Sequence, residues 1–239
     1  TELCVLFLED LREVEARVRT EKLASMGRLT ASIAHEIRNP LAAVSHAAAL
    51  MSEEAVQGSP RLLQIIQENV KRIDRIVGDV LSISRSGRAR LEAIPLAEAV
   101  TQAISELHRD SDIPPEWISL SVPPECMVWF DRSHLSQILN NLLENALRYS
   151  DGDIEISTGF ERNRKRVYLQ IRDHGPGIPE DQMKAMFEPF TQGDIARGSG
   201  GSGLGLAIIK KIVDMHHGDI TLHNHAYGGL VVTVYMPLR

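Results

Sequence analysis

Ala34-His-Glu-Ile-Arg-Asn-Pro40 stands inside a long amphipathic segment that predicts one helix over residues 10–55. Apolar residues recur through this segment at steps of three and four, which is a heptad-like seam that packs against other helices. The members of the seam are Ile33, Ile37, Pro40 or Leu41, Val44, Ala47 and Met51. The pattern therefore predicts a helical bundle around this stretch.

His35 is the candidate reactive group of this helix. At about 100° per residue it lies about 200° around the helix from Ile33, so it faces away from the seam and toward solvent. Asn39 is four residues further on and shares the face of His35, while Glu36 follows directly. Pro40 has no backbone N–H, so we expect the helix to bend there. A lone histidine would be read as an ordinary surface residue, and only its neighbours and the downstream motifs favour a reactive role.

A second helix is expected over residues 60–86. Ser59 suits the N-cap and Pro60 the first helical position, and Gly87 fits the stop. Its seam consists of Leu62, Ile66, Ile73, Ile76, Val80 and Ile83. Two antiparallel helices bury too little apolar surface alone, so we expect a homodimer that completes a four-helix bundle.

The rest of the chain alternates helical and strand patterns after a short basic linker. Helices are expected over 96–109, 132–149 and 204–216, and strands over 117–122, 126–130, 153–159, 166–172, 219–225 and 230–236. Mixed helices and largely antiparallel strands predict an α+β sandwich, with helices on one face of a sheet.

Composition sets limits on the class of protein. The 239 residues carry a net charge of −6, which gives no general case for nucleic-acid binding. Cys4 and Cys126 are far apart and fit reduced thiols of a cytoplasmic chain. No apolar run of 18 residues and no signal peptide are visible. The histidine pairs at 216–217 and 223/225 are read as surface residues rather than metal ligands.

Three segments further along the chain favour a bound nucleotide. Asn141 and Asn145 share one face of the predicted helix 132–149, where their amide oxygens can ligate Mg²⁺, and Arg148 can pair with phosphate. Asp173-His-Gly-Pro-Gly177 follows a predicted strand, with a carboxylate able to accept a hydrogen bond from an exocyclic amine.

The third segment is Gly198-Ser-Gly-Gly-Ser-Gly-Leu-Gly205, which opens a helix and so offers backbone N–H groups to phosphate. It lacks the Gly-Lys-Ser/Thr ending of a Walker A loop and is not part of a βαβ unit. Between the second and third segments, the aromatic side chains of Phe187-Glu-Pro-Phe190 can hold a lid. Each segment is weak evidence alone, and the set in this order is strong.

In residues 21–239 the sequence resembles the cytoplasmic part of a sensor histidine kinase of a two-component system. The resemblance rests on Ala34–Pro40 as H box, Asn141–Asn145 as N box, Asp173–Gly177 as G1, Phe187–Phe190 as F box and Gly201–Gly205 as G2. It implies a dimerisation and histidine-phosphotransfer domain at 10–87, a linker at 88–95 and a Bergerat-type (GHKL) ATP-binding domain at 96–239. Residues 1–9 resemble the end of a truncated PAS sensor domain.

The resemblance also implies an activity and its residues. His35 would be autophosphorylated from ATP, with Glu36 as general base and Mg²⁺ held by Asn145 and Asn141, before transfer to an aspartate of a response regulator. Asn39 would orient a water for dephosphorylation of that regulator. The nucleotide-binding residues implied are Asn141, Asn145, Arg148, Tyr149, Asp173, Gly175, Gly177, Ile178, Phe190, Arg197, Gly201, Ser202, Gly203, Leu204 and Gly205.

The subfamily signal is mixed. Residues 23–35 resemble kinases that regulate pili and nitrogen metabolism, whereas 192–197 and 207–214 resemble osmosensor-type kinases. Natural variation explains this mixture, and so does an engineered chimera joined near Phe190. The chain is expected to be a cytoplasmic fragment whose longer parent carries the sensor and any membrane anchor.

Two other classes of protein stay open. One is a nucleotide-binding scaffold or weak ATPase of the gyrase and heat-shock-ninety type, which has no need of an exposed His35 beside Glu36. The other is an interaction module that dimerises and has a decayed ATP site, against which the presence of Asn145, Asp173 and the G2 glycines argues.

Overall fold

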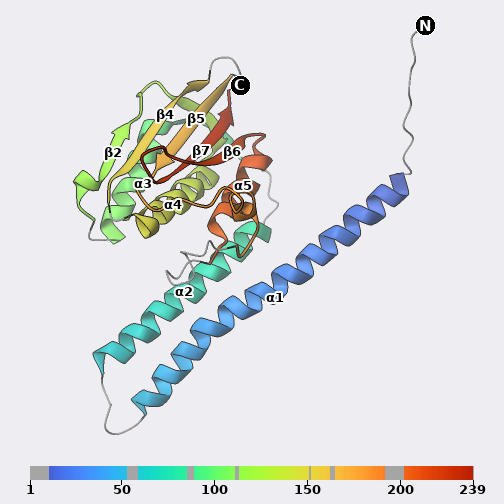
Figure 1. Ribbon diagram of the computed structural model, residues 1–239, viewed down its shortest axis with the longest axis vertical. Coiled ribbons are helices and arrows are strands. Elements are labelled where there is room, and N and C mark those ends of the chain that lie inside the picture. Colours follow the sequence, from blue (N-terminus) through green and yellow to red (C-terminus); the bar gives the residue numbers. More distant parts are fainter. Residues whose placement is uncertain are drawn as a thin grey trace. The chain divides into compact units, whose positions relative to one another are not determined.

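The computed structural model describes residues 11–52, 59–84, 89–110, 113–150, 152–161, 165–191 and 202–238, with only the backbone of 11–29, 82–84 and 110 (Figure 1). The chain divides into two compact units, Thr1–Val80 and Leu81–Arg239. The PAS-like end predicted at residues 1–9 lies outside the described residues.

The first unit is a hairpin of two long helices, α1 (Leu11–Met51) and α2 (Pro60–Ser84), the second of which ends beyond the unit boundary. The helices run antiparallel (Figure 1). Their seam includes Ala47 and Ile76, which are 2% and 1% exposed. Of the two alternatives at 40/41, Pro40 is buried and Leu41 is 55% exposed, so the seam passes through Pro40. Pro40 lies inside α1 and does not end it.

The second unit contains three α-helices, α3, α4 and α5, together with all the strands in the described residues. Their order is β1 (Leu91–Pro95), α3 (Leu96–Asp110), η2 (Pro115–Trp117), β2 (Ile118–Ser121), β3 (Met127–Asp131), α4 (Arg132–Tyr149), β4 (Ile154–Glu161), β5 (Arg166–Arg172), η4 (Ala185–Phe187), α5 (Gly205–Met215), β6 (Asp219–Asn224) and β7 (Leu230–Pro237). The element types agree with the prediction, apart from β1 and the two short 3₁₀ helices.

A five-stranded sheet, in the order β2-β4-β5-β7-β6, forms the centre of this unit. All its pairings are antiparallel except β2 with β4, which are parallel. Alternate residues of β5 are buried, Val167, Leu169 and Ile171, because helices cover only one face of the sheet. Figure 1 shows α3, α4 and α5 on that face, so the predicted α/β sandwich of the GHKL type is confirmed.

Strand β1 corrects part of the sequence prediction. Residues 88–95 were expected to be a linker, but Leu91–Pro95 pair with Met127–Asp131 of β3 in a separate antiparallel sheet. Ile94 is fully buried in this arrangement. A five-residue strand with a single buried side chain shows no alternating pattern, so its sequence gave no strand signal.

None of the helices in the described part of the chain combines the length and apolar character that crossing a membrane requires.

Candidate functional site

His35 lies on α1 with its side chain exposed, as its helical position predicts. The side-chain amide nitrogen Nδ2 of Asn39, one turn later, lies 3.5 Å from His35 Nδ1. An amide N–H in this position makes Nδ1 an acceptor and leaves the ring proton on Nε2. The orientation of Asn39 therefore bears directly on which imidazole nitrogen has a free electron pair.

Glu36 has a partner that the sequence did not reveal. Its Oε2 accepts a hydrogen bond of 3.3 Å from Nη2 of Arg72 on α2, and both side chains are partly exposed. The two residues are 36 positions apart, and only the register of the hairpin brings them together. Glu36 therefore follows His35 in the chain and pairs with the guanidinium group of Arg72.

In the second unit, the N-box amides meet the start of α5. Asn141 and Asn145 project from the same face of α4, and Gly205 is the first residue of α5. A Cβ on Gly205 would lie 3.4 Å from Asn141 Oδ1 and 3.5 Å from Asn145 Nδ2. The two predicted segments, 60 residues apart, therefore form one half-buried polar surface.

This surface fits the metal that the family implies. Amide oxygens are hard ligands, and Mg²⁺ usually combines one or two protein oxygens with waters and phosphates. Asn141 and Asn145 can supply such oxygens, and the absence of a side chain on Gly205 keeps the space beside them free. Arg148 is half-buried in the last turn of α4, one turn beyond Asn145.

Asp173 ends the central strand β5 and is 6% exposed. Its Oδ1 accepts two backbone hydrogen bonds, from Gly175 at 2.9 Å and from Leu230 at 3.0 Å. One carboxylate oxygen is therefore fixed by backbone N–H groups of the loop and of β7, and neither of these bonds involves Oδ2. A Cβ on Gly175 would collide with the carbonyl oxygen of Tyr149, so the close approach of the G1 loop to α4 requires glycine.

Asn224 is a second residue that sequence reasoning missed. From the end of β6, its Oδ1 accepts from the backbone N–H of Ile178 at 2.9 Å and its Nδ2 donates to the Ile178 carbonyl at 2.7 Å. These two bonds hold the far end of the G1 loop, next to Gly177. Only the fold places residues 46 positions apart in this contact, although an amide at a strand end is a weak signal of such a role.

A cavity of about 510 Å³ opens between the C-terminal end of α4 and the G1 loop. Its volume is typical of small-ligand pockets. The lining residues are Tyr149, Ser150, Gly152, Asp153, His174, Gly175 and Pro176. Tyr149 and Gly175 were both predicted for the nucleotide site, and the structure brings them to the same cavity.

The F box and the G2 segment meet through their backbones. The N–H of Phe190 donates to the carbonyl of Gly203 at 2.9 Å. Gly203 has φ +67°, which glycine adopts without strain, whereas Phe190 also has a positive φ of +64°. This bond joins the F box, which was expected to hold a lid, to the G2 segment, and Ser202 Oγ accepts from the N–H of Leu204 just before α5. The lid residues Arg197 and Gly201 lie outside the described residues.

His216 contradicts the expectation of a surface residue. It is 7% exposed, its Nε2 lies 3.0 Å from His134 Nδ1, and Phe130 stacks on its ring at 3.7 Å between centroids. Burial, followed by the nearby His134, lowers the pKa of His216 to about 4. His217 and His223 are exposed as expected. The pair of His134 and the buried His216 links the start of α4 to the end of α5, at the opposite end from Asn141 and Gly205.

Family models match both units. The His Kinase A (phospho-acceptor) domain matches residues 25–89, and the histidine kinase-, DNA gyrase B- and HSP90-like ATPase matches residues 130–239. His35 lies in the first match, and Asn141, Asp173 and Gly205 lie in the second.

Curated relatives match nearly the whole chain. Sensor protein kinase PilS of Pseudomonas aeruginosa is 35% identical over 236 residues, which is 94% of this chain and 43% of PilS. Signal transduction histidine-protein kinase BaeS of Escherichia coli is 36% identical over 231 residues, which is 92% of this chain and 48% of BaeS. The chain therefore spans about half the length of these relatives or slightly less.

Solved structures share the fold. A histidine kinase ThkA in complex with the response regulator protein TrrA has a TM-score of 0.72 and 25% identity, covering 96% of this chain and 67% of ThkA. Histidine kinase AdeS of Acinetobacter baumannii has a TM-score of 0.68 and 24% identity, covering 86% of this chain and 98% of AdeS. With both family models in order and the motif residues assembled as described, the chain belongs to the sensor histidine kinases of two-component systems.

Proposed function

We propose that this chain phosphorylates its own His35 from ATP and passes the phosphoryl group to an aspartate of a response-regulator protein. The observation that carries the proposal is the exposed His35 beside Glu36 on α1, in one chain with the N-box and G1 residues gathered at one end of α4 and the start of α5. A nucleotide-binding scaffold would need only the second of these sites.

In the phosphorylation step, His35 Nε2 forms a bond to the γ-phosphorus while the bond to the β,γ-bridging oxygen breaks and ADP leaves. Nε2 needs a free electron pair, so the proton must sit on Nδ1. The amide of Asn39 must therefore turn from the orientation in which its Nδ2 faces His35 Nδ1. Glu36 then accepts the Nδ1 proton, and Arg72 stays near to stabilise the carboxylate until it does so.

The second unit binds and orients the nucleotide. Asp173 Oδ2 accepts from the adenine amine, and the cavity beside Tyr149 and Gly175 takes the base. Backbone N–H groups at the start of α5 face the phosphates. Mg²⁺ bound by Asn141 and Asn145 would neutralise phosphate charge. Because His35 and this site belong to different compact units, transfer requires the second unit to present the γ-phosphate to His35.

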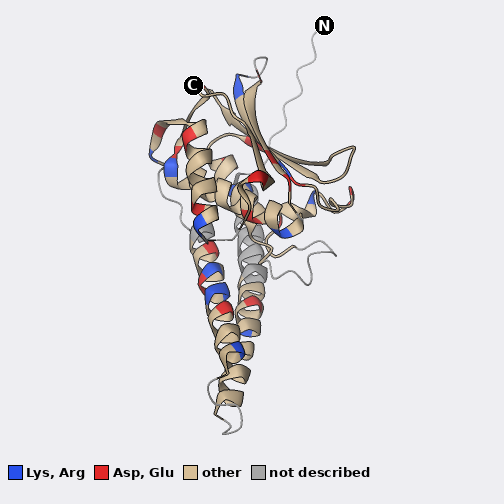
Figure 2. Cartoon of the chain, turned by 90° about the vertical axis from the view of Figure 1, so that its left-hand side faces the viewer, with Lys and Arg blue, Asp and Glu red and all other residues tan. Residues whose placement is uncertain are grey.

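Homodimerisation completes the first unit. Leu63, Val70 and Val77 repeat every seven residues along α2 and are 45%, 51% and 40% exposed in the single chain. Acidic and basic residues are interspersed elsewhere along this helix (Figure 2). An apolar heptad stripe between charged positions is the pattern of a helix that packs against a second hairpin.

The test is incubation of the purified chain with γ-labelled ATP and Mg²⁺, comparing the wild type with His35→Gln. We expect acid-labile label on the wild type and none on the variant, since phosphohistidine hydrolyses in acid. Nucleotide binding without any label on the wild type would favour the scaffold function instead.

Dephosphorylation of the regulator is the finer part of the proposal. Asn39 is exposed one turn from His35, where its amide can orient a water toward a phosphoaspartate docked beside the helix. Asn39→Ala should slow loss of label from the phosphorylated regulator at least tenfold while autophosphorylation continues. Unchanged dephosphorylation by this variant would remove Asn39 from that role.

A further inference from the structure

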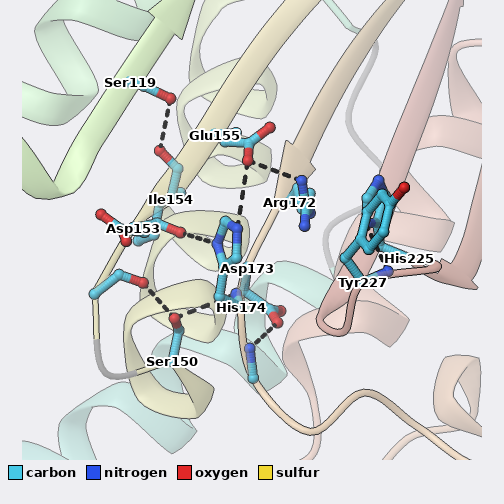
Figure 3. Close-up of polar contacts among 12 residues, drawn as sticks. Ser119, Ser150, Asp153, Ile154, Glu155, Arg172, Asp173, His174, His225 and Tyr227 are labelled. Carbon is cyan, nitrogen blue, oxygen red and sulfur yellow. Dashed lines mark hydrogen bonds and ion pairs between the residues drawn. The ribbon is translucent and has the colours of Figure 1, made fainter.

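His174, inside the G1 motif, has a structural role that the motif itself does not assign. It follows Asp173 where β5 ends, so the two side chains leave the chain on opposite sides. Asp173 is buried and bonded toward Leu230, whereas His174 is exposed and directed toward β4 (Figure 3). The G1 loop thus contacts β7 through Asp173 and the start of β4 through His174.

Three contacts attach His174 to the segment between the end of α4 and the start of β4. Its backbone N–H donates to Ser150 Oγ at 3.3 Å, where α4 ends. Its ring Nδ1 donates to the carbonyl oxygen of Asp153 at 2.5 Å. Its Nε2 lies 3.4 Å from Oε1 of Glu155, which Arg172 also contacts at 2.9 Å (Figure 3).

The same loop holds the carboxylate that faces the base. Asp173 also pairs with β7 through its own N–H, which donates to the carbonyl of Leu230 at 3.0 Å. This pairing fixes the residue that follows β5 to β7, but not to β4. On the β4 side, β4 begins at Ile154, and the backbone pairing with β5 ends at Glu155 and Arg172. Beyond that last pair, the His174 ring takes over the attachment of the loop to β4.

His174 also forms part of the wall of the 510 Å³ cavity, together with Tyr149, Asp153 and Gly175. Loss of its ring would remove part of the pocket wall and the side-chain attachment of the loop to Asp153 and Glu155. Both changes act on the base end of the site and leave Asn141 and Gly205 in place.

We propose that His174 is a positioning residue that sets the selectivity of the site for adenine, by holding the Asp173 loop against β4. The inference rests on the proposed function, in which Asp173 Oδ2 accepts from the adenine amine. A carboxylate held in place binds the amine of adenine, which donates a hydrogen bond to it. The carbonyl of hypoxanthine is an acceptor and leaves the buried carboxylate unpaired, which costs free energy. A loop free to shift loses that discrimination.

The experiment compares ADP with IDP, which carries a carbonyl in place of the adenine amine. Affinities of the whole chain are measured in Mg²⁺ by displacement of a fluorescent ATP analogue. The wild type should prefer ADP by about tenfold or more. In His174→Ala, ADP affinity should fall about tenfold and IDP affinity by less, so that the preference shrinks about fivefold. His174→Gln keeps a side-chain donor for Asp153 and should restore part of the preference.

His223→Ala is the matched control, because it removes an exposed histidine from β6 of the same sheet. It should leave both affinities within twofold, and the melting temperatures of all variants should be compared. Equal loss of ADP and IDP affinity in His174→Ala would overturn the positioning role and show a merely structural one. A wild type that does not distinguish ADP from IDP would overturn the base-reading role of Asp173, and the inference with it.

Discussion

At the scale of a single residue, Glu36 has two neighbours, Arg72 and His35, that bear on the proposed reaction. It pairs with Arg72 at 3.3 Å and stands beside His35, whose proton it must accept in the proposed reaction. Both members of the pair are partly exposed, at 20% and 33% of their side chains, and such pairs contribute less than about 1 kcal/mol. The carboxylate can therefore leave Arg72 at little cost when the reaction requires it.

Glu36→Gln should reduce autophosphorylation at least about 100-fold, because an amide accepts no proton at neutral pH. Nucleotide affinity should stay within twofold, since the nucleotide residues lie in the other compact unit. Acid-labile label from γ-labelled ATP gives the rate, and displacement of a fluorescent nucleotide gives the affinity. Glu68→Gln, which alters an exposed carboxylate on α2, serves as control. A variant at Glu36 that labels at the full rate would refute the base assignment.

Asp131 determines where α4 begins. Its Oδ1 accepts from the N–H groups of Ser133 and His134 at 3.0 and 3.3 Å, and its Oδ2 accepts from the N–H of Arg90 at 2.7 Å. Burial opposes ionisation, but hydrogen bonds from Ser133, Arg90 and His134 outweigh it and lower the pKa of Asp131 to about 2.

Asp131→Ala should lower the free energy of unfolding of the second unit by about 1–2 kcal/mol, as loss of a good N-cap does. The Asp131 pKa is lowered on folding, so its contribution is present above about pH 4 and is lost as pH falls toward 2. The difference between wild type and variant in urea unfolding should therefore shrink over that range. A difference that grows on acidification would contradict the assignment, and Asp131→Asn, which keeps a capping oxygen, should lie between the two.

At the scale of elements, α4 and α5 are held together at both ends. Gly205 lies against Asn141 and Asn145 at the end where we propose that the nucleotide binds, and His134 bonds to His216 at the other. One hydrogen bond between two imidazoles requires one donor and one acceptor, and burial of His216 disfavours its charged form. Two protonated rings would repel each other at this distance.

The His pair makes the packing of these helices sensitive to acid. The pKa of His216 is about 4 when folded and about 6.5 in an unfolded chain, so its contribution is complete above pH 6.5 and is lost as pH falls to 4. Stability should decrease over that range by on the order of 2 kcal/mol, and less in His216→Leu. Urea unfolding at several pH values measures this. His223→Gln is the control, because it removes an exposed histidine of β6. Identical pH dependence of wild type and His216→Leu would contradict the prediction.

At the scale of the whole molecule, a single chain leaves the stripe of Leu63, Val70 and Val77 uncovered. Val70→Glu should shift the apparent mass from twice the 26.5 kDa of one chain toward a single chain in sedimentation experiments, because it buries a charge in the dimer. Arg61→Gln changes the net charge by the same amount on the opposite side of α2 and should leave the mass unchanged. A wild type that sediments as a monomer at micromolar concentration would refute the dimer.

The sequence by itself determined the kinds of elements and the order of the motifs. The helix at 132–149 and the strand at 166–172 were predicted with the bounds that the structure has, because periodicity and capping are local properties of the chain. Asn141, Asn145, Asp173 and Gly205 were predicted as site residues for the same reason, since the residue types and spacings of each motif lie within a few turns or a single loop.

The tertiary structure alone decided the contacts between distant segments. It placed Leu91–Pro95 in a strand, Arg72 beside Glu36, Asn224 on Ile178 and His216 in the core next to His134. Each of these depends on which elements pack together and in what register. Local periodicity shows which face of a helix or strand is apolar, but not which of the other elements covers it, so the partners of Glu36 and His216 emerge only when the chain is folded.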